Sequence, residues 1–195
     1  MTSELAGIFV GGRGTRMGHV AKGLMRTADG MSIVERWRMM LERLGIRVVL
    51  VGVADAYVGL GIEALPDEPH GIGPLGGLVA LLRSATEGVV LALACDMPFV
   101  SSAIVERLIA APSGAVIVAP RSDGRWEPLC ARYDVARVLP MARALSRNTD
   151  HSLQRLLDDA GAIELPLAPH EVNELRDWDT PGDVTSSRLA HDQPD

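Results

Sequence analysis

Four glycines and three basic residues follow the first apolar run of the chain. The run Leu5–Val10 (LAGIFV) leads directly into Gly11–Lys22 (GGRGTRMGHVAK). Glycine tolerates positive φ angles and close approach, so several backbone N–H groups of such a loop can point into one concavity. A concavity of this kind binds anions, and Arg13, Arg16 and Lys22 add full positive charges. The segment therefore predicts a binding site for a di- or triphosphate.

The loop differs from two other phosphate-binding patterns. A Walker-type loop ends in Gly-Lys followed by Ser or Thr, whereas Lys22 is followed by Gly23. The dinucleotide fingerprint needs Gly-x-Gly-x-x-Gly, and Gly12, Gly14 and Gly18 miss that spacing by one residue. The alternative without chemistry is a tight turn between a strand and a helix with solvated arginines. For the loop taken alone, both interpretations stay open.

An aspartate stands directly after another apolar run. Val89–Ala94 (VVLALA) is followed by CDMP at 95–98. Ligands of open α/β sheets bind beyond the carboxyl ends of strands, and Mg²⁺ takes one or two carboxylates besides phosphates and water. Asp96 is therefore the predicted Mg²⁺ ligand. The alternative, that Asp96 caps the next helix, is disfavoured because Ser101 and Ser102 can supply that cap.

The two segments together resemble one known family. GGRGTRMGHVAKGLM (11–25) is similar to Gly-Gly-x-x-x-Arg-Met-Gly-x-x-Asp-Lys-x-Leu of nucleotidyltransferases with a Rossmann-like sheet, and CDMP is similar to their Cys-Asp-x-Pro. Among these enzymes the chain resembles the molybdenum cofactor guanylyltransferases, which are MobA-like and join GMP to molybdopterin. The chain departs from the signature at Ala21, where the family usually has Asp. The resemblance extends from about Leu5 to Asp183.

The resemblance implies roles for particular residues. Arg16 and Lys22 would bind the triphosphate, Asp96 would hold Mg²⁺, and glycines of the loop would wrap the phosphates. Those glycines are Gly11, Gly12, Gly14 and Gly18.

Two more segments complete the expected nucleotide site. GPLGG at 73–77 resembles a family element that places backbone groups beside the nucleobase, so Gly76 and Gly77 are candidates, and Asp67 matches an acidic residue near the nucleoside. Tight packing of a helix on a strand would explain the two glycines equally well. Asp177-Trp178-Asp179-Thr180-Pro181 resembles Asp-x-Asp-Thr-Pro, which implies Asp179 as a second metal ligand and Asp177 as the next candidate. The alternative is that Asp179 or Thr180 caps a last helix.

A further segment matches the part of the family that faces the second substrate. It is Arg121–Pro128 (RSDGRWEP). Its Trp126 either stacks on a pterin or packs as a partly buried tryptophan, and packing is the favoured alternative.

The expected elements alternate along the chain. Ser32–Leu44 has apolar residues at helical spacing, a capping box from Ser32 and Glu35, and Gly45 to end the helix. Strands that are apolar throughout are buried on both faces of a parallel sheet. We therefore expect a single-domain α/β Rossmann-like three-layer sandwich, with a mostly parallel sheet and helices on both faces, over residues 1–190, and a disordered tail at 191–195. Strands are expected at Leu5–Val10, Ile46–Gly52, Val89–Ala94, Ala115–Ala119, Glu127–Tyr133 and Ala162–Leu165, and helices at Ser32–Leu44, Leu75–Arg83, Ser101–Ala110, Val135–Leu145, Ser152–Ala160 and Pro181–Arg188.

Composition excludes several classes of protein. A net charge of −6 argues against a general nucleic-acid binder, which needs a basic surface. Cys95 and Cys130 lie in apolar stretches, so we expect two buried thiols and no zinc site. The sequence shows no signal peptide and no apolar run near the roughly 20 residues that a membrane helix needs. The expectation is a soluble, cytoplasmic protein.

The resemblance also implies a reaction. GTP and molybdopterin would be the substrates, the acceptor phosphate would attack the α-phosphorus, and pyrophosphate would leave. The resemblance is also compatible with transient contact between this protein and molybdenum cofactor biosynthesis proteins or molybdoenzymes. Three alternatives stay open: cytidylyl transfer, transfer to another phosphorylated acceptor, and nucleotide binding without catalysis. The Gly11-Gly12 pair and the GPLGG segment favour guanine, whereas Ala21 keeps the non-catalytic alternative open.

Overall fold

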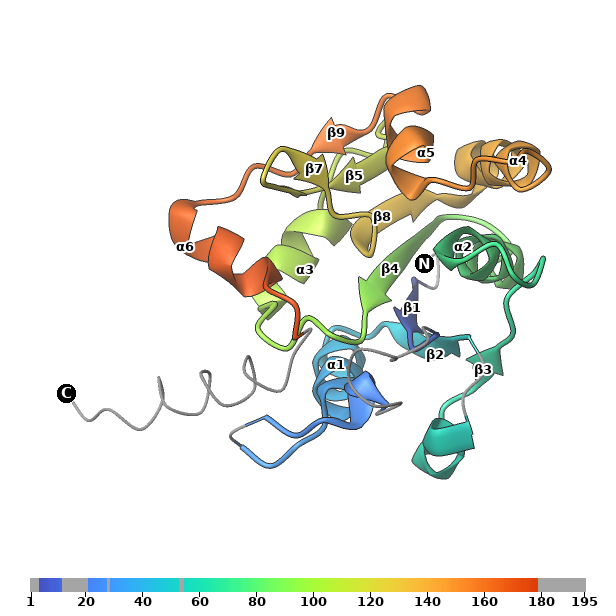
Figure 1. Cartoon of the computed structure of the whole chain (residues 1–195). Coiled ribbons are helices and arrows are strands. Elements are labelled where there is room, and N and C mark those ends of the chain that lie inside the picture. Colours follow the sequence, from blue (N-terminus) through green and yellow to red (C-terminus); the bar gives the residue numbers. More distant parts are fainter. Residues whose placement is uncertain (1–3, 12–20, 28, 53–54, 179–195) are drawn as a thin grey trace.

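A seven-stranded sheet forms the centre of the protein (Figure 1). The computed structural model describes residues 4–11, 21–27, 29–52 and 55–178. The strand order is β3-β2-β1-β4-β8-β5-β9; β8 runs antiparallel to both of its neighbours, and the other pairs are parallel. The predicted mostly parallel sheet is confirmed. The strands are β1 (Leu5–Phe9), β2 (Arg47–Val51), β3 (Ala64–Leu65), β4 (Val89–Ala94), β5 (Ile117–Ala119), β8 (Cys130–Asp134) and β9 (Ile163–Glu164), and a separate hairpin joins β6 (Arg121–Ser122) to β7 (Arg125–Trp126).

Helices cover both faces of this sheet, as predicted for a three-layer sandwich. Successive side chains of a strand point to opposite faces. In β1, Ala6 and Ile8 pack into one apolar cluster and Leu5 and Phe9 into another. The first cluster takes α1 (Ile33–Arg43) and α3 (Ser102–Ile109), and the second takes α2 (Pro74–Ser84), α4 (Val135–Leu145) and α5 (Leu153–Asp159). Shorter helical segments are η2 (Lys22–Leu24), η3 (Asp55–Leu60), α6 (Pro169–Val172) and η4 (Asn173–Leu175).

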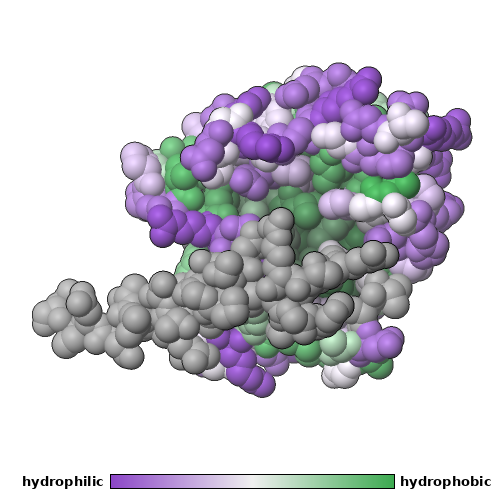
Figure 2. All heavy atoms as spheres, in the orientation of Figure 1, coloured by the Kyte–Doolittle hydropathy of each residue, from purple (hydrophilic) through white to green (hydrophobic). Residues whose placement is uncertain are grey.

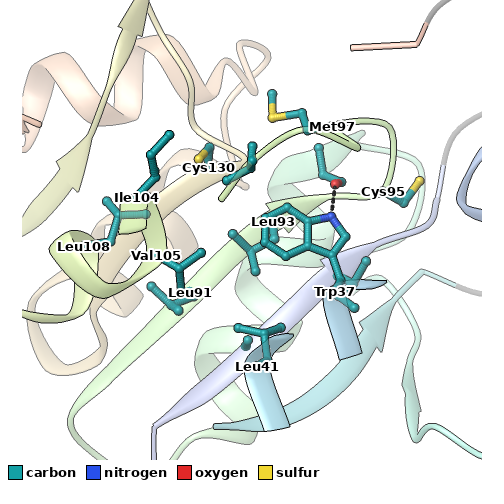
Figure 3. Packing of buried hydrophobic residues seen from close by; sticks show 14 of the residues in the cluster. Trp37, Leu41, Leu91, Leu93, Cys95, Met97, Ile104, Val105, Leu108 and Cys130 are labelled. Atoms are coloured by element: carbon teal, nitrogen blue, oxygen red, sulfur yellow. Dashed lines mark hydrogen bonds between the residues drawn. The ribbon is translucent and has the colours of Figure 1, made fainter. Parts of the chain in front are cut away.

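The first cluster lies between α1, α3 and the middle of the sheet (Figure 3). The indole Nε1–H of Trp37 donates to the carbonyl oxygen of Ala94 at 3.1 Å, which ties α1 to the end of β4. Cys95 and Cys130 are free and buried, as predicted, and Figure 3 shows them at separate places in this cluster. The hydrophobic residues also show in the hollow of the face drawn in Figure 2, below a largely hydrophilic upper rim.

The helix ends follow from local hydrogen bonds. Around α1 the predicted capping box is present, since Glu35 N–H donates to Ser32 Oγ at 3.2 Å and Ser32 N–H donates to Glu35 Oε2 at 2.8 Å. Gly45 follows with φ +76°, a conformation that favours glycine and ends the helix. The serine cap expected for α3 is wrong, because the Ser101 side chain makes no capping bond; its N–H donates to Glu174 Oε2 at 3.0 Å instead.

Some boundaries of strands and helices differ between the sequence-based prediction and the structure. The strand expected from Glu127 begins at Cys130, because residues 127–129 form a turn closed by a bond from Cys130 N–H to the Glu127 carbonyl oxygen at 3.0 Å. The helix expected at Pro181–Arg188, and the tail at 191–195, lie outside the described residues. No helix within the described ranges is long and apolar enough to cross a bilayer.

Candidate active site

Three parallel strands bring their carboxyl ends to one edge of the sheet. Phe9 at the end of β1 pairs with Val51 of β2 and with Ala94 of β4. Gly11 and Asp96 therefore emerge at the same edge, where ligands of α/β sheets bind. A Cβ on Gly52 would lie 2.8 Å from the backbone nitrogen of Gly11, so the chain after β2 contacts the beginning of the glycine-rich loop.

Lys22 and Asp96 form an ion pair at this edge. The Lys22 Nζ atom lies 3.0 Å from Asp96 Oδ2, although 74 residues separate the two in sequence. Their side chains are 20% and 24% exposed, so both remain accessible to a ligand. A cation that can bind phosphate oxygens thus lies beside a carboxylate that can hold a metal ion.

Packing around Gly23 holds Lys22 in place. The Gly23 N–H donates to the Tyr57 hydroxyl oxygen at 3.1 Å, and a Cβ on Gly23 would lie 2.6 Å from Val34 Cγ2. Burial, reinforced by Cys95, raises the pKa of Tyr57, so the phenol stays neutral. Ala21, which stands where the signature that this loop resembles has Asp, is partly buried against the first apolar cluster.

Backbone bonds from both sides hold Asp96. Cys95 N–H donates to the Phe9 carbonyl oxygen at 3.2 Å, and Trp178 N–H donates to the Asp96 carbonyl oxygen at 2.8 Å. The Trp178 ring packs edge-on against Phe99, with ring centroids 5.8 Å apart. Burial, with Asp96 adding to it, raises the pKa of Cys95 to about 12, so this buried thiol stays protonated at neutral pH.

Sequence reasoning missed a third acidic residue of this region, Glu127. The antiparallel strand β8 begins with Cys130 opposite Leu93, so the residues just before β8 lie at the carboxyl end of β4. Burial, then the negative charges of Asp177 and Asp96, raise the pKa of Glu127 to about 7. The resemblance placed the whole segment Arg121–Pro128 towards the second substrate without singling out Glu127, and the antiparallel insertion of β8 brings this residue to the edge.

A cavity of about 460 Å³ is lined by Met97, the residue that follows Asp96 in the chain. Met97, Glu127 and Asp177 are among its lining residues, from segments that follow β4, precede β8 and end the described chain. Trp126 also lines the cavity, but its Nε1–H donates to Asp158 Oδ1 at 2.8 Å and the Arg121 guanidinium lies 3.7 Å from its ring centroid. These contacts agree with the packing role favoured for Trp126.

Asp67, Gly76 and Gly77 lie close together. Asp67 follows β3, and burial raises its pKa, partly offset by His70. A Cβ on Gly76 would lie 2.3 Å from the Pro69 carbonyl oxygen, and one on Gly77 would lie 2.6 Å from Val51 Cγ1. Intramolecular packing therefore accounts for both glycines, while their contact with a nucleobase stays a prediction.

The rest of the predicted site lies outside the described residues: Gly12, Gly14, Arg16, Gly18 and Asp179. Within the described ranges, no group of three or more His, Cys, Asp or Glu residues is placed to hold a metal ion. A Mg²⁺ ion that completes its coordination with substrate phosphates and water needs fewer protein ligands. The accessible Asp96 carboxylate fits that requirement.

Comparison with known proteins decides the family. Residues 6–164 match the MobA-like NTP transferase domain. The chain belongs to the MobA-like NTP transferase family. It is 31% identical to the molybdenum cofactor guanylyltransferase of Xanthomonas euvesicatoria pv. vesicatoria, over 96% of this chain and 95% of that protein. It is 33% identical to the Pseudomonas putida protein of the same name, over 77% of this chain and 80% of that one.

A solved structure agrees with the fold of this MobA-like protein. The crystal structure of molybdopterin-guanine dinucleotide biosynthesis protein A from Archaeoglobus fulgidus superposes with a TM-score of 0.76 and 23% identity, over 96% of this chain and 98% of that one. The predicted fold and family are confirmed. The chain is a nucleotidyltransferase, and the non-catalytic alternative is set aside.

Proposed function

We propose that this MobA-like nucleotidyltransferase transfers GMP from GTP to the terminal phosphate of molybdopterin. An oxygen of the acceptor phosphate attacks the α-phosphorus. The bond from that phosphorus to the oxygen bridging to the β-phosphate breaks, and pyrophosphate leaves with the electron pair. The attacking phosphate is already anionic, so the reaction needs no protein nucleophile and no general base. The observation that carries the proposal is the accessible Lys22–Asp96 pair at the carboxyl edge of the sheet, together with relatives that bear the guanylyltransferase name over most of their length.

The ion pair suits a Mg²⁺–triphosphate complex. The positive charge of Lys22 would bind phosphate oxygens, with Arg16 and the loop glycines Gly11–Gly18 around them. Asp96 would hold Mg²⁺, with Asp179 as second ligand, and bound Mg²⁺ would neutralise charge on the α-phosphate and pyrophosphate. Lys22 and Asp96 neutralise each other in the structure, and the incoming complex offers each a partner of opposite charge. Positioning and charge stabilisation then carry the chemistry.

The compartment and the recipient of the product belong to the same proposal. A GTP-consuming enzyme fits the cytoplasm, where that nucleotide is made. The dinucleotide product must reach the proteins that use it. We therefore propose transient contact with molybdenum cofactor biosynthesis proteins or molybdoenzymes.

The test measures transfer directly. Purified protein with GTP, Mg²⁺ and molybdopterin should give the dinucleotide and an equal amount of pyrophosphate, whereas CTP should give neither. Asp96→Asn should lower the rate by about 10²–10³-fold, the usual effect of removing one group that stabilises transition-state charge. Asp159→Asn is a matched control, because Asp159 is exposed and pairs with Arg155 on the surface of α5. An unchanged rate in Asp96→Asn would remove Asp96 from the mechanism, and equal transfer from CTP would remove the choice of guanine.

A further inference from the structure

The cavity beside Asp96 lies on the acceptor side of the site. The residues expected to bind the nucleotide follow β1 and β3, whereas Glu127 precedes β8, on the other side of β4 in the sheet. Asp96 follows β4 and lies between these two halves. A nucleotide on the β1 side would present its α-phosphate near Asp96, which leaves the β8 side for the acceptor. This placement rests on the function proposed above.

The cavity has the size and the charges for an acceptor with two different ends. Its volume of about 460 Å³ lies within the range of small-molecule sites, roughly 300–1,000 Å³. Arg125 and Arg176 line it and can bind phosphate oxygens through their guanidinium groups. Glu127 lines the same cavity and presents a carboxyl group to it. A ligand with a phosphate at one end and hydrogen-bond donors at the other would match both.

Glu127 is held as an open acceptor of hydrogen bonds. Its backbone is fixed on both sides, since its N–H donates to the Pro120 carbonyl oxygen at 3.0 Å and its carbonyl oxygen accepts from Cys130 at 3.0 Å. Its side chain is half-buried, and within the described part of the chain its carboxylate forms no hydrogen bond or ion pair. A half-buried carboxylate without such partners gains much from a ligand that donates to it.

We propose that Glu127 is the specificity-determining residue for the acceptor, and that its carboxylate accepts two hydrogen bonds from the pterin ring. The pyrimidine edge of a pterin carries a 2-amino group beside N3–H, two donors side by side. A carboxylate presents two acceptor oxygens at a matching spacing. An acceptor with a carbonyl in place of the 2-amino group would turn an oxygen toward the carboxylate and be rejected.

The experiment uses two free ring systems as probes, pterin and lumazine, which differ in that lumazine carries a carbonyl where pterin has the 2-amino group. Ring fluorescence is titrated with wild-type protein, Glu127→Gln and the control Glu106→Gln, which makes the same exchange at an exposed position of α3. Wild type and Glu106→Gln should bind pterin more tightly than lumazine. Glu127→Gln should bind pterin roughly 10- to 100-fold more weakly, the effect of losing hydrogen bonds to a charged group.

Two results of the ring titrations would contradict the role proposed for Glu127. Equal binding of the two rings by wild type, or binding of neither, overturns the assignment without any variant. An unchanged preference for pterin in Glu127→Gln overturns it as well. An equal rise of the melting temperature with GTP in all three proteins shows that the fold is intact.

The transfer assay separates this inference from the proposed function. If no dinucleotide forms while the preference for pterin depends on Glu127, the proposed function fails and the assignment of Glu127 stands. If the dinucleotide forms and Glu127→Gln leaves the KM for molybdopterin unchanged, the assignment fails and the function stands. Support for both is a raised KM for molybdopterin with an unchanged KM for GTP.

Discussion

Residues of opposite charge lie close together at the sheet edge formed by the carboxyl ends of the parallel strands. The Lys22 ammonium group meets the Asp96 carboxylate at 3.0 Å, whereas Glu127 lies near two other acidic groups and is half-buried. Burial and like charges both disfavour a carboxylate, so the proton stays on Glu127 to an unusually high pH. Carboxyl groups with perturbed pKa values concentrate at functional sites. There a ligand can supply the hydrogen-bond donors or the opposite charge that the protein does not provide.

The raised pKa of Glu127 predicts a pH-dependent stability. Its value is about 7 in the folded protein against an ordinary value of 4.5, so the folded state binds this proton more tightly than the unfolded state. The free energy of unfolding therefore falls as pH rises from about 4.5 to about 7, and this contribution is constant above that range. Glu127→Gln removes the fall. Its melting temperature should exceed that of wild type at pH 8 by an amount on the order of a few degrees, and this excess should vanish towards pH 4.5.

Thermal unfolding at several pH values checks this, with Glu106→Gln to account for the loss of one negative charge. A difference between Glu127→Gln and wild type that does not change with pH would show that the Glu127 proton plays no part in stability.

At the scale of elements, the beginning of α2 shows how packing determines which residues a helix can carry. Two glycines in the first turn of a helix lower its intrinsic stability by roughly 1 kcal/mol each relative to alanine. Gly76 nevertheless lies where a Cβ would be 2.3 Å from the Pro69 carbonyl oxygen. Because that neighbour is backbone, it cannot rotate away. The absence of a side chain on Gly76 therefore allows α2 to pack closely against the segment that carries Asp67.

Gly76→Ala should therefore destabilise the protein, although alanine is the better helix former. The expected loss is about 1–3 kcal/mol, the usual cost of overpacking. Gly59→Ala in η3 is the matched control, because no heavy atom of the described residues lies within 4 Å of its added Cβ. Chemical denaturation measures the free energies of unfolding. If Gly76→Ala leaves that free energy intact but weakens GTP binding, the glycine serves the nucleobase and not the packing.

At the scale of the whole molecule, the site is assembled from distant parts of the chain. The segment after β9 returns to α3, where the Arg107 guanidinium pairs with Glu171 at 2.7 Å and the Ser101 N–H donates to Glu174 at 3.0 Å. Figure 1 shows α6 beside α3 on this side of the sheet. Trp178, the last described residue of this segment, donates its backbone N–H to the Asp96 carbonyl oxygen. The path of the segment after β9 therefore places Asp177 at the cavity that Glu127 also lines.

Trp178→Ala should lower both stability and transfer. Trp178 is 3% exposed, and its truncation should cost about 3–5 kcal/mol, as for other buried tryptophans. Loss of the packing on Phe99 should also loosen the bond to Asp96 and reduce the transfer rate. Trp178→Phe keeps an aromatic ring and the backbone N–H, and should retain most of both. Denaturation curves and pyrophosphate release measure the two effects, and a wild-type rate in Trp178→Ala would uncouple this segment from the reaction.

The sequence by itself determined the elements whose causes are local. The apolar run Val89–Ala94 and the helix Val135–Leu145 agree with the structure at both ends, because periodicity and capping depend on residues a few positions apart. The glycine-rich signature likewise indicated the family, because close backbone approach to phosphates restricts neighbouring residues. Only the tertiary structure decided three features: the pairing of Lys22 with Asp96, the packing of Gly76 on Pro69, and the place of Glu127. The first and the third depend on strand order and on long-range chain reversals, whereas Gly76 contacts Pro69 across the turn between β3 and α2. The direction of β8, which is antiparallel to both of its neighbours, cannot be read from the periodicity of the sequence.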